Sequence, residues 1–199
     1  MRISDVDILI VPGWSGSDPD HWQSRWERNL KTARRVHQED WYFPQRDRWT
    51  ARIAAAVEEA ERPVVLVAHS LGVITVAHAA PNLDANKVAG AYLVAPADVD
   101  NAKSWPVTNG HSFEEQAGKF KPLPMEPLPF PAALVASHSD PYCSFERAKE
   151  MAAQWGAKLI EAGDVGHVNI ASGHGPWPDG LLQLGVFLKG LSEPAAGKN

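Results

Sequence analysis

The chain has 199 residues, which is long enough for one domain with a sizeable hydrophobic core. Hydrophobic residues make up 44% of the sequence and charged residues 22%, the ordinary balance of a globular protein. The formal net charge is −5, and no local block of Lys or Arg offsets it. Nucleic acid is therefore excluded as the expected partner, because a phosphate backbone requires a basic binding surface.

The sequence contains one cysteine, Cys143, which rules out an intramolecular disulfide and gives no support for secretion. The first 14 residues place two aspartates before a short apolar run, unlike a signal peptide. No window approaches the roughly 20 apolar residues of a membrane span. We therefore expect a cytoplasmic protein that binds no membrane, and the sequence leaves its oligomeric state open.

The first third of the chain alternates strand and helix patterns. Residues 7–13 form an apolar run that ends in a Pro-Gly turn, which is typical of a buried strand. A helix should follow, with Asp18 as its N-cap and Pro19 at its first position. After a weaker strand candidate at 34–41, a second helix is predicted to start near Asp47.

The alternation continues to the end of the chain. Residues 63–70 resemble a strand buried on both faces of a parallel sheet, and residues 71–80 a helix that is apolar nearly all round. Further strands are predicted at 88–96, 132–140 and 157–163, and further helices at 144–156 and around 181–188. Residues 1–191 are thus predicted to form a single domain, and residues 192–199 a disordered tail.

Strands that alternate with helices predict an α/β fold with a mostly parallel central sheet and helices on both faces. Right-handed crossovers bring the carboxyl ends of parallel strands to one edge of the sheet. Active sites of open α/β sheets lie along that edge. The residues that follow each predicted strand are therefore the first candidates for a functional site.

A serine, an acid and a histidine stand at or just after the carboxyl ends of three separate predicted strands, as Ser70, Asp140 and His167. A serine hydroxyl becomes a strong nucleophile when a histidine takes its proton, and a buried carboxylate orients that histidine. The order serine, acid, histidine is the order of the α/β-hydrolase triad. Asp98 and Asp164 also follow strands and stay open as alternatives for the acid, and His174 as an alternative for the base.

The segment around Ser70 reads "AHSLG", close to the G-x-S-x-G pattern of a nucleophile elbow. Ala68 replaces the first glycine and adds one methyl group, while Gly72 keeps the second position bare. The competing interpretation is a simple strand-to-helix turn with Ser70 as the helix N-cap. An oxyanion hole would use the backbone N–H groups of Leu71 and, from the loop after the first strand, Trp14.

Other chemistries find little support in the sequence. Eight histidines are present, but no H-E-x-x-H motif and no paired cysteines suggest a metal site. The glycines near residue 13 match neither a P-loop nor a dinucleotide-binding fingerprint. We expect no metal and no cofactor.

Four segments resemble a known family of small α/β-hydrolases, which includes retinoblastoma-binding protein 9 and bacterial YdeN-like serine hydrolases. They read "VPGWSGSDPDHWQSRWE", "VLVAHSLG", "ASHSDPYCSFERA" and "GDVGHVNIASGHGPWPDG". The resemblance implies a compact α/β-hydrolase without a large lid domain, with its triad on Ser70, Asp140 and His167. The L-x-C-x-E motif associated with the retinoblastoma-binding member is missing around Cys143, so retinoblastoma binding is not expected.

The resulting hypothesis is a serine hydrolase that cleaves small carboxylic esters, thioesters or amides through an acyl-enzyme. The alternatives are a non-catalytic interaction protein of the same fold and an acyltransferase that uses the same triad. The Pro-rich stretch between Pro96 and Pro131 is either a short cap over the site or an ordinary surface loop. As a cap it would offer an apolar lining of Phe113, Phe120 and Phe130.

Overall fold

A six-stranded parallel sheet forms the centre of the molecule, and the computed structural model describes residues 1–105 and 113–191. The strands lie in the order β2-β1-β3-β4-β5-β6, and each neighbouring pair is parallel. Their bounds are β1 Asp7–Val11, β2 Ala33–Arg35, β3 Val64–Ser70, β4 Val88–Pro96, β5 Ala132–Ala136 and β6 Lys158–Glu161. The predicted α/β fold with a parallel sheet is confirmed.

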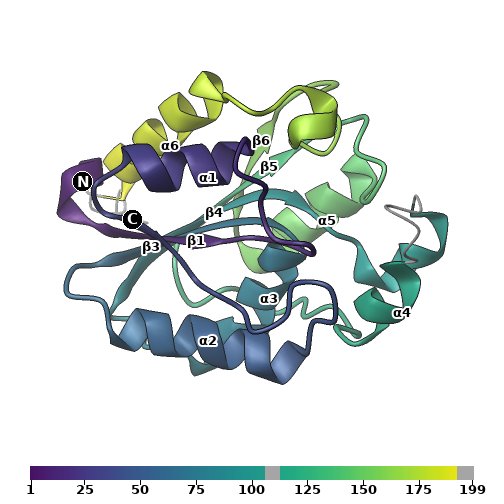
Figure 1. The fold of residues 1–199 in the computed structure, drawn as a ribbon, viewed down its shortest axis with the longest axis horizontal. Helices are drawn as coiled ribbons and strands as arrows, with labels where there is room; N and C mark the ends of the chain where they lie inside the picture. The colour runs from purple at the N-terminus through teal and green to yellow at the C-terminus, as the bar shows by residue number, and fades with distance from the viewer. Residues whose placement is uncertain (106–112, 192–199) are drawn as a thin grey trace, which may run out of the picture.

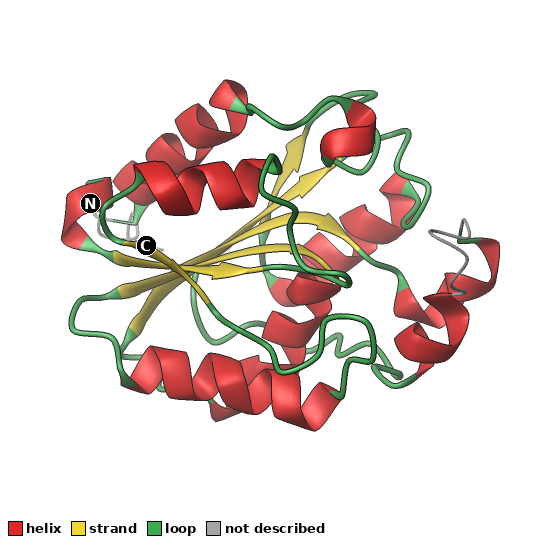
Figure 2. Cartoon of the chain, viewed as in Figure 1, coloured by secondary structure: helices red, strands yellow, loops and turns green. Residues whose placement is uncertain are grey.

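Helices cover both faces of the sheet (Figures 1 and 2). One face carries α1 (Trp22–Asn29) and α6 (Pro178–Gly190), and the other carries α2 (Arg46–Glu58), α3 (Leu71–Ala79) and α5 (Phe145–Trp155). A short helix, α4 (Phe113–Gly118), lies among the connections after β4. Single 3₁₀ turns occur at Ile3–Asp5, Ala80–Asn82, Val99–Ser104 and Ile170–Ser172. The two layers enclose two separate apolar clusters, one on each side of the sheet.

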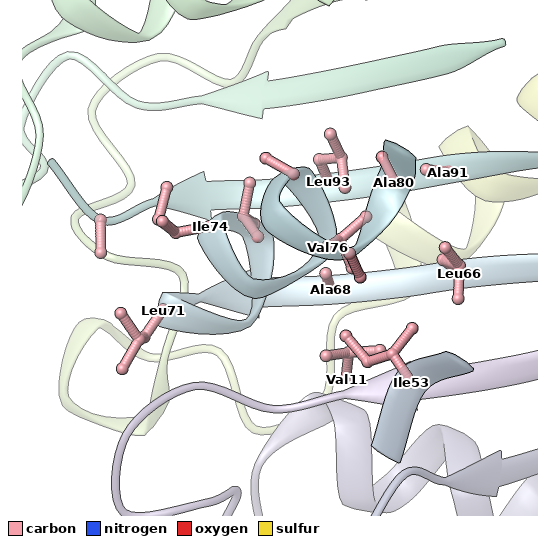
Figure 3. Packing of buried hydrophobic residues seen from close by; sticks show 14 of the residues in the cluster. Val11, Ile53, Leu66, Ala68, Leu71, Ile74, Val76, Ala80, Ala91 and Leu93 are labelled. Carbon is pink, nitrogen blue, oxygen red and sulfur yellow. The ribbon is translucent and has the colours of Figure 1, made fainter. Parts of the chain in front are cut away.

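The helix that follows β3 is buried almost completely, as its sequence predicts. It packs against the sheet beside α2, and Figure 3 shows Ile74 and Val76 of α3 among apolar side chains of β3 and β4. Ile74 and Val76 are both 0% exposed. Fully burying a side chain of this size contributes about 1.5–3 kcal/mol, so α3 is firmly held against the sheet. The N-terminus of α3 therefore holds the preceding residue, Ser70, in a fixed position.

The chain reverses its direction of travel across the sheet between β1 and β3. It runs from β1 outward to β2 and then returns to β3 on the other side of β1. Such a switch point opens a crevice at the carboxyl ends of the two central strands, because their connecting loops leave in opposite directions. Here these are the loop after Val11 and the turn at Ser70.

Four details differ from the sequence predictions. The first helix begins at Trp22, not at Pro19, because residues 18–21 form a turn closed by the His21 N–H and the Asp18 carbonyl, and His21 takes the N-cap. The strand predicted at 34–41 is limited to Ala33–Arg35, the strand predicted at 132–140 ends at Ala136 because the chain turns at 138–139, and α4 was not predicted. The Pro-rich segment 122–131 forms neither helix nor strand, and the predicted tail 192–199 lies outside the described residues.

Candidate active site

Ser70 stands in a strained turn between β3 and α3. Its φ of +56° and ψ of −125° lie in a region that non-glycine residues rarely adopt. Such strain is retained where the surrounding structure enforces it, and it is concentrated at functional sites. The Ser70 side chain makes no capping hydrogen bond to α3, so the interpretation of Ser70 as a simple helix cap is wrong. The turn presents the hydroxyl at the sheet edge instead.

Two glycines allow the backbones to approach each other around this turn. A Cβ placed on Gly72 would lie 2.6 Å from the carbonyl oxygen of Pro12, closer than real Cβ atoms come. A Cβ on Gly13 would lie 2.8 Å from Cβ of Ser70 and 3.1 Å from the backbone nitrogen of Leu71. The loop after β1 therefore runs directly beside the start of α3, in the crevice that the topology predicts.

His167 connects Ser70 to Asp140. Its Nε2 lies 2.9 Å from Oγ of Ser70, and its Nδ1 lies 2.9 Å from each carboxylate oxygen of Asp140. The side chains of His167 and Asp140 are only 7% and 2% exposed. When Nδ1–H donates to the carboxylate, Nε2 carries the lone pair that accepts the serine proton. The three residues predicted from separate strand ends are thus brought together in one hydrogen-bonded chain.

The loop that carries His167 is held by serines of the neighbouring loop after β5. Ser137 Oγ accepts a hydrogen bond from the N–H of Val165 at 3.1 Å, and Ser139 Oγ accepts one from the N–H of Gly166 at 3.0 Å. Neither serine was predicted to have a role, although both stand in the "SHSD" segment that ends in Asp140. They couple the loop of the base to the loop of the acid.

A second histidine holds the backbone of the first. His69, which precedes the nucleophile, places Nε2 2.8 Å from the carbonyl oxygen of His167. Burial lowers the pKa of His69 well below its usual range, and burial also lowers the pKa of its neighbour His21 to about 3. His69 therefore stays uncharged at neutral pH, and its Nε2–H donates to the His167 carbonyl. His69 thus supports the site through the backbone of His167 and takes no part in the proton transfer.

We predict that His69→Phe lowers kcat by about 10- to 100-fold, because a loosened His167 loop misplaces the imidazole by a fraction of an ångström. His69→Gln keeps an N–H donor and should lose much less. Steady-state kinetics with an activated ester would separate the two variants, and their melting temperatures would report any loss of folding. Equal kcat values for His69→Phe and the wild type would contradict the role.

The alternative acids and the alternative base lie elsewhere. Asp98 is buried, but its Oδ1 pairs with Nε of Arg147 at 3.5 Å and its Oδ2 accepts from Asn101 at 2.7 Å. Asp164 is exposed to solvent. His174 places its Nδ1 3.2 Å from Oγ of Ser172. Of the candidates weighed from the sequence, Asp140 is the carboxylate found at the His167 ring.

A cavity of about 200 Å³ opens beside Ser70. Trp14, Phe113 and Tyr142 supply its aromatic wall, and Asn169 to Ala171 line its other side. Phe113 was predicted as a lining residue, whereas Tyr142 was not, although its position two residues after Asp140 was an available signal. Phe120 and Phe130 were expected beside it and instead lie in the core, 0% and 5% exposed, because they pack under the sheet with α2 and α5.

Within residues 1–105 and 113–191, no group of three His, Cys, Asp or Glu side chains is arranged to hold a metal ion. In the same part of the chain, no helix combines the length and the apolar character needed to cross a bilayer.

The parallel sheet with a sharp serine turn after its central strand is the architecture of an α/β-hydrolase. The chain belongs to the serine hydrolase family, whose pattern matches residues 8–186. This agrees with the resemblance found in the sequence and identifies the protein as an enzyme, a serine hydrolase.

Solved structures of several hydrolases are similar to this chain. A YdeN-like hydrolase from Pectobacterium atrosepticum is 34% identical, with a TM-score of 0.81 over 95% of this chain and 94% of its own. The ydeN gene product of Bacillus subtilis is 21% identical, with a TM-score of 0.72 over 92% and 98%. The esterase Est2 of Thermogutta terrifontis, solved with butyrate bound, is 15% identical, with a TM-score of 0.67 over 99% and 88%. A search of curated proteins found no match.

Proposed function

We propose that the protein hydrolyses small carboxylic esters, thioesters or amides through a covalent acyl-enzyme on Ser70. The observation that carries this proposal is the continuous chain of contacts from Ser70 through His167 to Asp140, each at 2.9 Å. Ser70 and His167 line the cavity, and Asp140 is buried behind His167, so the reactive hydroxyl faces the space that a substrate can enter. The chain of contacts supplies what nucleophilic catalysis by serine requires.

In the first half of the reaction, Nε2 of His167 takes the Ser70 proton while Oγ attacks the carbonyl carbon of the substrate. The carbonyl oxygen becomes an oxyanion, and Asp140 stabilises the imidazolium. The tetrahedral intermediate then collapses, and His167 gives its proton to the leaving alcohol, thiol or amine. In the second half, His167 takes a proton from water, hydroxide adds to the acyl carbon, and the carboxylic acid leaves as Ser70 regains its proton.

The oxyanion is assigned to the backbone N–H groups of Leu71 and Trp14. Leu71 begins α3, whose N-terminus favours negative charge, and the loop that carries Trp14 passes beside the Leu71 nitrogen. The Trp14 indole N–H donates to the carbonyl of Tyr42 at 2.9 Å, which holds this loop in place. The loop that carries the backbone N–H of Trp14 is thereby tied to the segment around Tyr42.

Short acyl chains suit this site best. The cavity of about 200 Å³ lies below the 300–1,000 Å³ typical of pockets for drug-sized ligands, and aromatic rings close its wall. We predict that p-nitrophenyl acetate and butyrate are hydrolysed with kcat/KM at least about 10-fold higher than the octanoate, because a long chain has no room to bury its methylene groups. A series of chromogenic esters measures this directly, and a kcat/KM that rises up to octanoate would contradict it.

The direct test of the proposed function is covalent labelling by a fluorophosphonate probe, which reacts with an activated serine. We predict that the wild type is labelled, that peptide mapping places the label on Ser70, and that Ser70→Ala is not labelled. An exposed serine such as Ser4 should stay free of label in the same digest. An unlabelled wild type, or equal labelling of Ser70→Ala, would show that the serine is not activated.

The distance between Ser70 and His167 also bears on the alternatives. A lapsed, non-catalytic member of the fold has no need for the serine within hydrogen-bond reach of the histidine. Acyl transfer would use the same acyl-enzyme with an alcohol or amine in place of water. Product analysis in the presence of competing nucleophiles distinguishes transfer from hydrolysis.

A further inference from the structure

The outer face of α6 carries two exposed apolar side chains. Leu182 is 69% exposed and Val186 is 60% exposed, whereas Leu184 between them is completely buried. Residues four apart in a helix lie on the same face, so Leu182 and Val186 form one stripe that points away from the core. A paired apolar stripe on the surface indicates a contact with another molecule more strongly than a single exposed residue does.

An apolar groove runs beside this stripe. It has a volume of about 570 Å³ and lies between α6 and β6, the strand at the edge of the sheet. Leu159 and Ile160 of β6 form one wall, and Phe187 and Leu191 form the other. Figure 1 shows α6 and β6 on the periphery of the molecule. The groove therefore offers an open apolar surface next to β6, the outermost strand of the sheet among the described residues.

Four residues on this face of α6, the two of the stripe and two charged ones, are arranged symmetrically about Leu184. Leu182 and Val186 stand two positions before and after it, and Asp179 and Lys189 stand five positions before and after it. At 3.6 residues per turn, these four residues fall within a sector of about 80° on the side of the helix opposite Leu184. Asp179 and Lys189 are exposed like the two apolar residues.

This arrangement is complementary to itself. When a second α6 runs antiparallel to the first, with the two Leu184 positions level, Leu182 of one helix faces Val186 of the other. The same alignment places Asp179 opposite Lys189 at both ends, so that acidic and basic groups meet twice. A twofold axis requires this property, because it brings the same surface of both copies together.

We propose that this face of α6, consisting of Asp179, Leu182, Val186 and Lys189 with the groove beside them, joins two copies of the chain in a twofold-symmetric dimer. Helices that pack in this way approach to about 8–10 Å, which brings the apolar stripes of the two copies into contact between the two grooves. The cavity beside Ser70 is lined from other segments, so the dimer leaves the proposed active site open.

Sedimentation velocity on the full-length chain tests the proposal. We expect the sedimenting species to reach twice the 21.7-kDa mass of one chain as the protein concentration is raised to about 100 µM. Leu182→Glu should weaken dimerisation at least about 10-fold, because the change occurs twice in a symmetric interface. Phe43→Glu is the matched control, since Phe43 is 56% exposed on another surface, and it should leave the dimer intact. Ester hydrolysis and melting temperature should stay close to wild type in both variants.

Charge reversal tests the antiparallel alignment. Asp179→Lys and Lys189→Asp should each weaken the dimer by about 2- to 5-fold per affected pair, and the double variant should recover it, because opposite charges face each other again. Mixed L182C and V186C variants should form a disulfide between copies more readily than either variant does alone. The native Cys143 is buried and stays out of this reaction.

Several results would overturn the proposal. A wild type that stays monomeric up to about 100 µM lacks the interface. A dimer that survives Leu182→Glu would show that the two copies associate through a surface other than this face of α6. Cross-linking that is no better in the mixture than in the single variants would show the same. A full-length monomer that dimerises only after removal of residues 192–199 would show that the end of the same chain covers the groove.

Discussion

Asp140→Asn is expected to lower kcat for ester hydrolysis by about four orders of magnitude while leaving the fold intact. The asparagine amide can donate to Nδ1 of His167, and this stabilises the tautomer in which Nε2 carries the hydrogen. His167 then cannot accept the Ser70 proton. Ser70→Ala, which removes the nucleophile itself, sets the lower limit, at a loss of about six orders. KM should change little in both variants, because neither side chain is assigned to substrate binding.

Two matched variants separate the acid from its alternatives. Asp98→Asn removes the ion pair with Arg147, so it should lower the melting temperature but reduce kcat by less than about 10-fold. Asp164→Asn changes an exposed side chain and should have no measurable effect on either quantity. A loss of activity in Asp98→Asn that equals the loss in Asp140→Asn would contradict the assignment of the acid.

Gly72→Val is expected to destabilise the fold by about 3 kcal/mol or more, and the protein that still folds should have lost most of its hydrolytic activity. A side chain at this position collides with the backbone carbonyls of Val11 and Pro12, and no rotamer relieves a clash that begins at Cβ. To make room, α3 must move away from β1, and the Ser70 turn moves with it. For a chain of this size, the melting temperature should fall by about 6–12 °C.

Two other substitutions that change a small residue should affect stability much less than Gly72→Val does. Ala68→Gly removes the methyl group at the other small position of the elbow and should cost only about 0.5–1 kcal/mol, through backbone entropy. Gly185→Ala adds the same methyl group to α6, where a Cβ meets no atom within 4 Å, and should be neutral or stabilise by up to about 1 kcal/mol. Thermal denaturation of the three variants checks this order, and a Gly72→Val protein as stable as Gly185→Ala would refute the packing argument.

The strands and the long helices were predictable because their signals are local. The apolar run 64–70 predicted a strand buried on both faces, and residues 64–69 of β3 are buried. The bounds of β4, 88–96, are those predicted from its apolar run. The start of α1 was misplaced because Asp18 and Pro19 form a good helix start in isolation. The turn that they form instead depends on the His21 cap and on packing against β1 and β3 through Gln23, whose amide donates to Val11 and Val67 carbonyls.

The candidate site also has features that were predictable from the sequence and features that depend on tertiary contacts. Ser70, Asp140 and His167 could be proposed from their order and from their positions after strands, since parallel strands bring those positions to one edge. Position after a strand did not by itself separate Asp140 from Asp98, because both follow a buried strand, and it was the family resemblance that favoured Asp140. The choice depends on Arg147 of α5, which lies against Asp98, and on two serines that bring the His167 loop toward Asp140.

The sequence by itself thus determined the layers of the fold, the strand that presents Ser70 and the order of the reactive residues. Periodicity and turn chemistry encode these features within short windows. Only the tertiary structure decided which acid meets His167, that His69 holds its backbone, that Phe113 lines the cavity while Phe120 lies in the core, and that α6 leaves an apolar stripe in solvent. Each of these depends on contacts between segments distant in sequence, whose distances and directions are set by the packing of the whole chain.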